Sequence, residues 1–175
     1  TLHVHQVAYL VDHGLSAMVA ASVVGVVGLA SVVGKTGGGW LSDRFERELV
    51  FVCGIAILVA SVAVLAWTGR MPSAFGTYTY AIMLGIGYSA TASLVPAMMS
   101  DRFSGVYFGS IIGIGLFGSA LGSAIGPWLA GLTFDRTGSY DTAFVIAAIA
   151  GIASGSAGWI ARVLRLRERS ANLSG

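Results

Sequence analysis

Residues 49–67 read LVFVCGIAILVASVAVLAW and carry no charged side chain. A helix needs about 20 consecutive apolar residues to cross the hydrocarbon core of a bilayer, with a working range of roughly 17 to 25. The stretch is long enough for one crossing, and it lacks the polar face that a surface helix of a soluble protein requires. It therefore predicts a helix that spans a membrane.

The whole chain has the same apolar character. Of its 175 residues, 55% are hydrophobic and only 10% are charged, and the mean hydropathy is +0.81. Soluble domains carry about 25% charged residues, so lipid is the solvent that suits this composition. No basic run is interleaved with aromatic residues, which argues against nucleic acid as a partner. Cys53 is the single cysteine, so an internal disulfide and a cysteine-based metal site are excluded, and we expect neither a metal nor a cofactor.

Four further segments are long and apolar enough to span a bilayer. They are residues 16–41, 73–99, 105–134 and 142–164. Residues 1–11 form the end of a sixth span, and because the chain does not begin with Met we expect it to be part of a longer protein. Short links between long helices give an antiparallel bundle. We therefore predict an all-α membrane protein with one transmembrane domain over residues 1–164 and a tail over residues 165–175.

The positions of lysine and arginine orient the spans. Loops alternate between the two sides of the membrane, and cytoplasmic loops carry an excess of these residues. Eight of the ten cations fall on the side of the tail, and only Arg70 and Arg136 fall on the other. We therefore expect a multi-pass protein of the cell (inner) membrane with a cytoplasmic C-terminus.

Residues 39–48, GWLSDRFERE, join the first two complete spans. Gly39 permits close helix packing, and Asp43 and Arg44 lie where a helix ends and can pair with a neighbouring helix end. A loop of ordinary paired charges explains the stretch equally well. The pattern G-x-L-x-D-R followed by a charged cluster resembles the signature loop of the major facilitator superfamily. The resemblance implies that Gly39, Asp43, Arg44 and Arg47 act as a gate, against a half that this chain does not contain.

A second match lies in residues 126–140, GPWLAGLTFDRTGSY, which resemble the end of helix eleven and the start of helix twelve in the same superfamily. The two matches have the right order and separation. They imply that the chain is the C-terminal half of the helical bundle, with five full spans plus the end of a sixth, and that the missing N-terminal half is its partner. The family usually has glycine where Glu46 stands, which predicts a looser and more acidic loop here.

Lys35 is the most informative single residue. It lies eight positions before Asp43, which places it about 12 Å inside the span. A cation at the bilayer centre costs about 2.5 to 3.5 kcal/mol on insertion scales, so it normally faces a cavity or a partner. The alternative is that its side chain snorkels to the membrane surface. The string Gly34-Lys35 then Gly39-Trp-Leu-Ser-Asp43 resembles the branch of monocarboxylate carriers and oxalate–formate exchangers, which often has arginine at this place in contact with the substrate carboxylate.

The first residues of the chain resemble the end of helix seven in that branch, where a histidine and a following aromatic residue recur. His5 and Tyr9 are four residues apart and share a helix face. They are candidates for lining the cavity, and a histidine there could exchange protons near neutral pH. Equally, both residue types are common at the membrane interface. We expect Ser16 to cap the next helix.

Hydroxyl-bearing side chains are frequent in residues 73–99, where most are expected to bond to their own helix. Tyr80 and Tyr88 are weaker candidates for cavity lining. The following span carries glycines at four-residue steps, a pattern that favours close helix contact. We expect these glycines to serve helix packing and to take no part in substrate binding. They are Gly105, Gly109, Gly113, Gly118, Gly122 and Gly126.

The resemblance implies secondary active transport of a small organic anion by alternating access, coupled to proton symport or anion exchange. The oxalate exchangers carry a second intramembrane lysine that this chain lacks, so a monocarboxylate fits better than oxalate. No stretch matches a nucleotide-binding loop, and we expect no enzymatic activity. The alternatives are an exporter of drugs or hydrophobic metabolites, and a non-transporting membrane sensor or orphan half-domain.

Overall fold

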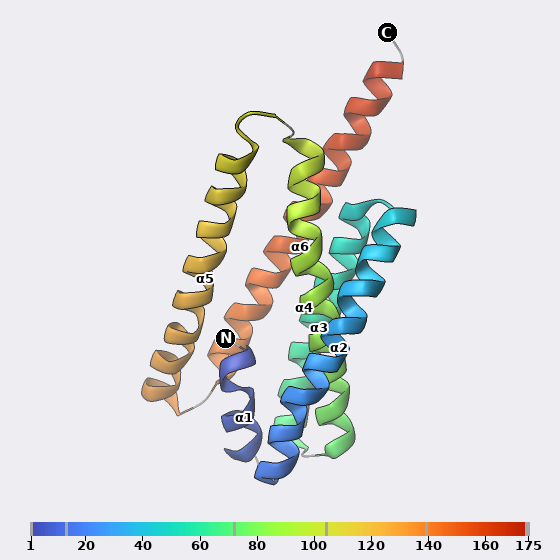
Figure 1. Ribbon diagram of the computed structural model, residues 1–175. Helices are drawn as coiled ribbons and strands as arrows, with labels where there is room; N and C mark the ends of the chain where they lie inside the picture. Colours follow the sequence, from blue (N-terminus) through green and yellow to red (C-terminus); the bar gives the residue numbers. More distant parts are fainter. Residues whose placement is uncertain (1, 13, 72, 104, 139, 174–175) are drawn as a thin grey trace.

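The computed structural model describes residues 2–12, 14–71, 73–103, 105–138 and 140–173 (Figure 1). Within these ranges it defines all side chains except those of residues 2–5, 8, 141, 168, 169 and 171–173. The described residues contain six α-helices and no strand. The helices are α1 (Leu2–Asp12), α2 (Ala17–Arg44), α3 (Arg47–Arg70), α4 (Ala74–Arg102), α5 (Phe108–Thr137) and α6 (Asp141–Leu173).

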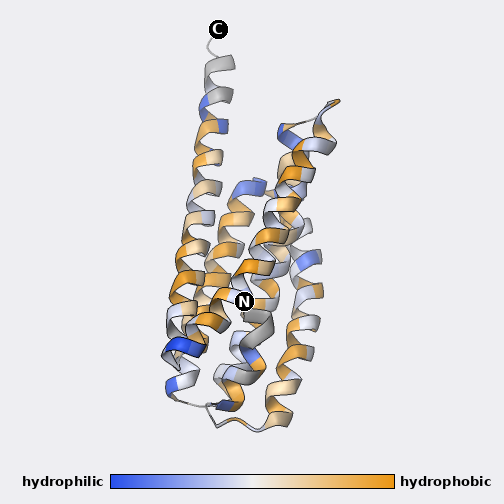
Figure 2. Cartoon of the chain, turned by 90° about the vertical axis from the view of Figure 1, so that its left-hand side faces the viewer, coloured by the Kyte–Doolittle hydropathy of each residue, from blue (hydrophilic) through white to orange (hydrophobic). Residues whose placement is uncertain are grey.

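Five of these helices, α2 to α6, are long and apolar enough to cross a membrane. Figure 2 shows apolar residues along most of their length, with hydrophilic residues mainly near the ends. The predicted all-α membrane fold is confirmed. Each long helix ends at least three residues after the end predicted for its span, whereas α2, α4 and α5 begin one to three residues after the predicted start. Helix α6 continues to Leu173, so the described part of the predicted tail is helical.

The helices begin and end at residues suited to those positions. The Ser16 side chain accepts a hydrogen bond from the amide of Val19 (3.3 Å), which confirms the predicted cap of α2. Ser73 caps α4 in the same way through the amide of Gly76 (3.1 Å). Gly138 ends α5 with a φ of 67°, a left-handed conformation that glycine adopts without steric cost.

Helices α2 and α4 pack at glycine contacts. A Cβ atom added to Gly34 of α2 would lie 2.3 Å from Ser89 Oγ, and one added to Gly85 of α4 would lie 2.6 Å from the carbonyl oxygen of Val27. The contacting residues rise together along both helices, since Val27 faces Gly85 and Gly34 faces Ser89. The two helices therefore run parallel, in close contact of the kind that small residues permit in membranes.

Helices α3 and α6 complete the packed part of the bundle. Gly87 of α4 lies against α3, because an added Cβ would lie 2.8 Å from the Leu58 amide nitrogen. On the other side of α3, an added Cβ on Gly151 or Gly158 of α6 would lie within 2.8 Å of a side chain of α3. Glycine thus sets the spacing of all four helices.

Helix α5 stands apart from this unit, as Figure 1 shows. Of its residues only Ala130 is buried. A Cβ added to Gly109, Gly113 or Gly118 would meet no atom within 4 Å. Most of the predicted glycine ridge therefore has no packing partner among the described residues.

The end of the bundle that holds the α1–α2, α3–α4 and α5–α6 links, called the loop end below, is filled by aromatic side chains. The ring of Tyr9 in α1 meets the ring of Phe144 edge-on, with centroids 4.9 Å apart, and Tyr140 stacks on Phe134 at 4.4 Å. Burial, followed by the charges of Asp12 and Asp135, raises the pKa of Tyr140 above its ordinary value. The phenol therefore stays neutral in this apolar cluster.

Candidate functional site

Lys35 lies inside α2, nine residues before its last residue, Arg44, which corresponds to about 13 Å along the helix axis. Its side chain is exposed in this structure. Among the described residues no hydrogen bond or ion pair connects it to another side chain. A cation in this position is the kind of intramembrane charge that marks a pathway or a binding site.

Tyr88 of α4 lies at the same depth as Lys35. Because Gly34 packs against Ser89, the adjacent residues Lys35 and Tyr88 lie at the level of that contact. Successive residues of a helix are turned by about 100°, so Lys35 lies 100° past the contact point on α2 and Tyr88 lies about 100° before it on α4. Since the helices are parallel and face each other, these opposite rotations turn both residues to one side of the α2–α4 pair.

The opposite side of the pair is filled by α3. Ala90 of α4 is turned the other way from Tyr88, and a Cβ added to Gly54 of α3 would lie 3.8 Å from its methyl group. Lys35 and Tyr88 are therefore on the face that α3 leaves open, and the Tyr88 side chain is 49% exposed there. We call these two residues the Lys35–Tyr88 face.

Tyr80 and Tyr9, two other candidates for cavity lining, are inside the packed core. Tyr80 is completely buried and donates a hydrogen bond of 3.1 Å to Oε1 of Gln6 in α1, which is also buried. Tyr9 belongs to the aromatic cluster at the loop end. The structure does not bring either residue to the Lys35–Tyr88 face. The side chain of His5 lies outside the described residues, so its predicted role stays a prediction.

The four predicted gating residues lie at the tail end, the end of the bundle that holds the α2–α3 and α4–α5 links. Arg47 donates hydrogen bonds to a carboxylate oxygen of Asp101 (3.0 Å) and to the carbonyl oxygen of Ala97 (3.3 Å), which connect α3 to α4. The Arg44 guanidinium lies over the Trp40 ring, 4.3 Å from its centroid. Asp43 is exposed, and no ion pair connects it to another described residue.

The prediction of a loose loop at Glu46 was wrong. The α2–α3 link consists of Phe45 and Glu46 alone, and the Glu46 carboxylate is hydrogen-bonded to Arg162 of α6. An acidic side chain here gains a cationic partner in the last helix, so the link is held in place without glycine. Sequence reasoning missed this pair because the two residues are 116 positions apart.

A second ion pair connects the same two helices. Glu48 is buried and lies 2.9 Å from a terminal nitrogen of Arg165, although the contact lacks the geometry of a hydrogen bond. Glu46 immediately precedes α3 and Glu48 lies in its first turn, while Arg162 and Arg165 share one face of α6. Each spacing is visible in the sequence, but nothing local connects the two acids to the two arginines. We call these four residues the α3–α6 ion pairs.

The Lys35–Tyr88 face offers a fixed positive charge and a phenol at one depth in the membrane. Such a pair suits a small anion, since the ammonium group supplies up to three hydrogen-bond donors and the phenol supplies one. Among the described residues there is no group of three or more histidine, cysteine, aspartate or glutamate side chains that could hold a metal ion.

The Major Facilitator Superfamily model matches residues 5–174 of the chain. Among curated proteins the chain is 24% identical over 170 residues to human monocarboxylate transporter 12, which covers 97% of the chain and 33% of that relative. It is 28% identical over 149 residues to rat monocarboxylate transporter 13, covering 83% of the chain and 34% of the relative. It is 31% identical over 125 residues to the probable nitrate/nitrite transporter NarK2 of Mycobacterium tuberculosis (strain ATCC 25618 / H37Rv), covering 70% of the chain and 31% of the relative. The chain thus spans about a third of the length of these relatives.

Proposed function

The chain belongs to the major facilitator superfamily of membrane transporters, and on that premise we propose that it is the C-terminal half of a transporter for a small, singly charged organic anion, most simply a monocarboxylate. A second helical half would complete the transporter. This half would pack against the faces that α2, α4 and α5 leave open, and the substrate would bind between the halves near the bilayer midplane.

The observation that carries the proposal is the position of Lys35. A lysine inside a membrane helix is costly unless it faces a cavity, a partner or water. Here the side chain is exposed, on the side of the α2–α4 pair that α3 does not fill, and Tyr88 lies beside it at the same depth. A carboxylate bound there would supply the missing negative charge.

The names of the relatives support a singly charged anion. Two of them are named for monocarboxylates and one for nitrate and nitrite. Each of these ions carries a single negative charge that is delocalised over its oxygen atoms. One lysine is the matching charge on the protein, and an ammonium group is a point charge that selects for charge more than for planar shape.

The proposed mechanism is alternating access with proton symport or anion exchange. Uptake of an anion into a negative interior costs about 2.3 kcal/mol per charge at 100 mV, so it requires coupling. The excess of arginine at the tail end supports a cytoplasmic orientation of that end. Asp43 and Arg44 are exposed at this end, where they could bind the second half and release it as the halves rock. Arg47 would act through its contact with Asp101.

The test is uptake of radiolabelled lactate and pyruvate by the complete transporter in reconstituted vesicles. Lys35→Ala should lower uptake by at least about tenfold, since a charge-assisted hydrogen bond contributes roughly 1.5 to 3 kcal/mol. Lys35→Arg should retain part of the activity. The matched control is Thr36→Ala, because the Thr36 hydroxyl donates to the Val32 carbonyl of its own helix (2.9 Å) and is not used in the site.

Unchanged carboxylate uptake by Lys35→Ala, at a normal protein level in the membrane, would overturn the assignment. Competition by added nitrate distinguishes a carboxylate transporter from a transporter of inorganic anions such as nitrate. Strong competition by nitrate together with weak uptake of carboxylates would replace the organic anion with an inorganic one.

A further inference from the structure

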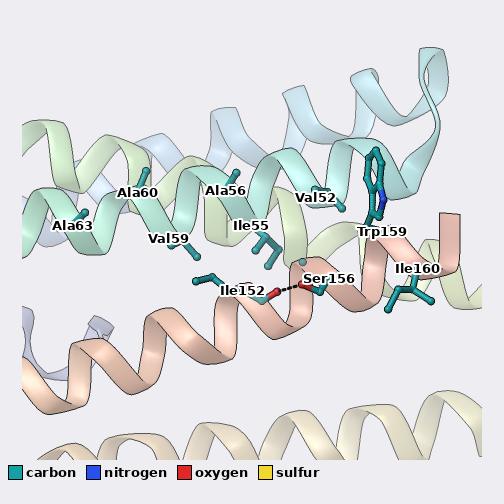
Figure 3. A pocket seen from close by; sticks show the side chains of 11 residues that line it. Val52, Ile55, Ala56, Val59, Ala60, Ala63, Ile152, Ser156, Trp159 and Ile160 are labelled. Atoms are coloured by element: carbon teal, nitrogen blue, oxygen red, sulfur yellow. Dashed lines mark hydrogen bonds between the residues drawn. The ribbon is translucent and has the colours of Figure 1, made fainter. Parts of the chain in front are cut away.

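A groove of about 640 Å³ runs along the seam between α3 and α6. Its volume lies in the range of ligand pockets, roughly 300 to 1,000 Å³. The α3 side is hollowed because it carries small side chains, Ala56, Ala60 and Ala63. Figure 3 shows these three alanines on α3, and Ile152 and Ile160 on the neighbouring α6.

The lining is almost wholly apolar. The one hydroxyl in it, on Ser156, donates to the Ile152 carbonyl of its own helix (2.9 Å), as Figure 3 shows. The other side-chain donor in the lining is the indole N–H of Trp159 at the tail end, so most of the groove offers no polar group to a ligand. Both helices are long and apolar enough to span a membrane, and an apolar hollow between two such helices suits a hydrocarbon chain.

The length of the groove matches one leaflet. It runs from Val52 to Ala63 on α3, which corresponds to about 16 Å along the helix axis. The hydrocarbon core of a bilayer is about 30 Å thick, so one leaflet measures about 15 Å. Val52 lies five residues after Arg47, the first residue of α3, and Ala63 lies seven residues before Arg70, its last, so the groove begins near the tail end and ends past the middle of α3.

Interfacial residues mark the tail end of the groove. Trp159 lines it there, 46% exposed, and the Arg162 guanidinium lies 5.0 Å from the centre of its ring. Tryptophan is enriched at the level of lipid headgroups. Arg162 itself is bound to Glu46, so its charge is already compensated.

Arg167 supplies a further positive charge beyond this point. It lies seven residues after Ile160, so it continues the groove-lining face of α6 past the end of the hydrocarbon region. Its side chain is exposed, and no ion pair connects it to another described residue. The apolar groove thus leads to a tryptophan and then to an exposed arginine.

We propose that this groove binds one acyl chain of an anionic phospholipid, with the lipid phosphate at Arg167. Arg167 favours a lipid of net negative charge over a zwitterionic lipid, whose own cationic group offsets the charge of its phosphate, and the apolar lining of the groove favours a lipid over a soluble ligand. The site is separate from the Lys35–Tyr88 face, because α3 lies between them.

The test uses the complete transporter, purified and stripped of lipid with detergent. Thermal unfolding is measured with added phosphatidylglycerol or phosphatidylcholine of the same acyl chains, and lipid that stays bound is counted by native mass spectrometry. The expected result is a larger rise in unfolding temperature with phosphatidylglycerol and retention of about one tightly bound lipid per chain.

Two variants remove different parts of the site. Ala60→Leu fills the groove and should abolish the retained lipid, whereas Arg167→Gln should weaken the phosphatidylglycerol preference about fivefold, the equivalent of about 1 kcal/mol for one arginine near an anionic surface. Matched controls are Ala153→Leu, an exposed alanine of α6 outside the groove, and Arg136→Gln, an exposed arginine at the loop end.

Equal stabilisation by both lipids, or full retention of phosphatidylglycerol by Arg167→Gln, would overturn the proposal. So would cross-linking that finds a second copy of the chain in the groove. If Ala60→Leu fails to fold, Arg167→Gln and the comparison of the two lipids still decide the question, independently of any transport measurement.

Discussion

Helices α4 and α5 use the same residue type in two different environments. In α4, Gly85 and Gly87 lie so close to α2 and α3 that an added Cβ would come within 2.6 to 2.8 Å of a backbone atom. In α5, Gly109, Gly113 and Gly118 face open space, although their four-residue spacing predicts helix contact. A glycine pattern in a membrane helix therefore indicates that a close neighbour fits there, while the identity of that neighbour has to come from elsewhere. For α5 the faces left open are available to the proposed second half.

The largest difference in stability is expected when leucine replaces a packed glycine of α4 and, for comparison, an unpacked glycine of α5. Gly85→Leu should lower the free energy of unfolding by about 3 kcal/mol, because backbone atoms of α2 cannot move aside and overpacking at such contacts is costly. Gly113→Leu should change it by less than about 0.5 kcal/mol, as at other surface sites. The measurement is unfolding by sodium dodecyl sulfate in mixed micelles of the chain by itself.

The same two variants in the complete transporter test whether the second half packs on α5. If the second half packs on α5, Gly113→Leu becomes destabilising or lowers transport there, while Gly85→Leu is harmful in both settings. Equal loss of stability for both variants in the chain by itself would mean that α5 is packed within this half after all.

A smaller effect is expected from the α3–α6 ion pairs. Glu48→Ala leaves Arg165 without its partner in a partly buried position, where the side-chain exposure of Arg165 is only 20%. Breaking a fully buried pair costs about 3 to 5 kcal/mol, and partial exposure reduces this to about 1 to 3 kcal/mol here. The double variant Glu48→Ala/Arg165→Met should recover part of the loss, measured by the same unfolding titration. If the double variant recovers no stability, the effect of Glu48→Ala comes from lost packing at that site.

The smallest effect is expected at the more exposed pair between α3 and α4. Arg47 and Asp101 retain 31% and 45% side-chain exposure, so their coupling energy should be about 0.2 to 1 kcal/mol and should fall with added salt. A double-mutant cycle with Arg47→Met and Asp101→Asn measures it. A coupling energy larger than that of Glu48 and Arg165 would contradict the expectation that the more buried ion pair contributes more to stability.

Much of the fold could be predicted because each span is a local property of the sequence. The uncharged residues 49–67 fall within α3, and Ser16 caps α2 as expected. Lys35 was recognisable as a candidate because a charge inside an apolar segment is conspicuous without any tertiary information. The partner of Glu46 was not recognisable, since Arg162 lies at the far end of the chain and no local pattern connects them.

The candidate site was predicted less completely than the fold. Tyr9, Tyr80 and Tyr88 looked alike in the sequence, as aromatic residues inside apolar helices. In the structure Tyr9 and Tyr80 are buried, whereas Tyr88 is half exposed and lies at the same depth in the bundle as Lys35. The difference depends on which side of each helix its neighbours cover, and a single helix without amphipathic patterning does not reveal that side.

The sequence shows that this protein lies in a membrane, that five segments are long and apolar enough to cross it, and that one end carries the arginine excess. These properties follow from the solvation of each segment in lipid, which depends on the segment's own residues. The folded bundle is needed to see which glycines are packed, that Glu46 and Glu48 bind α6, and that Lys35 and Tyr88 share an open face. Lipid solvates all apolar sides of a helix alike, so hydrophobicity does not choose among them, and that choice depends on close packing and ion pairs between distant segments.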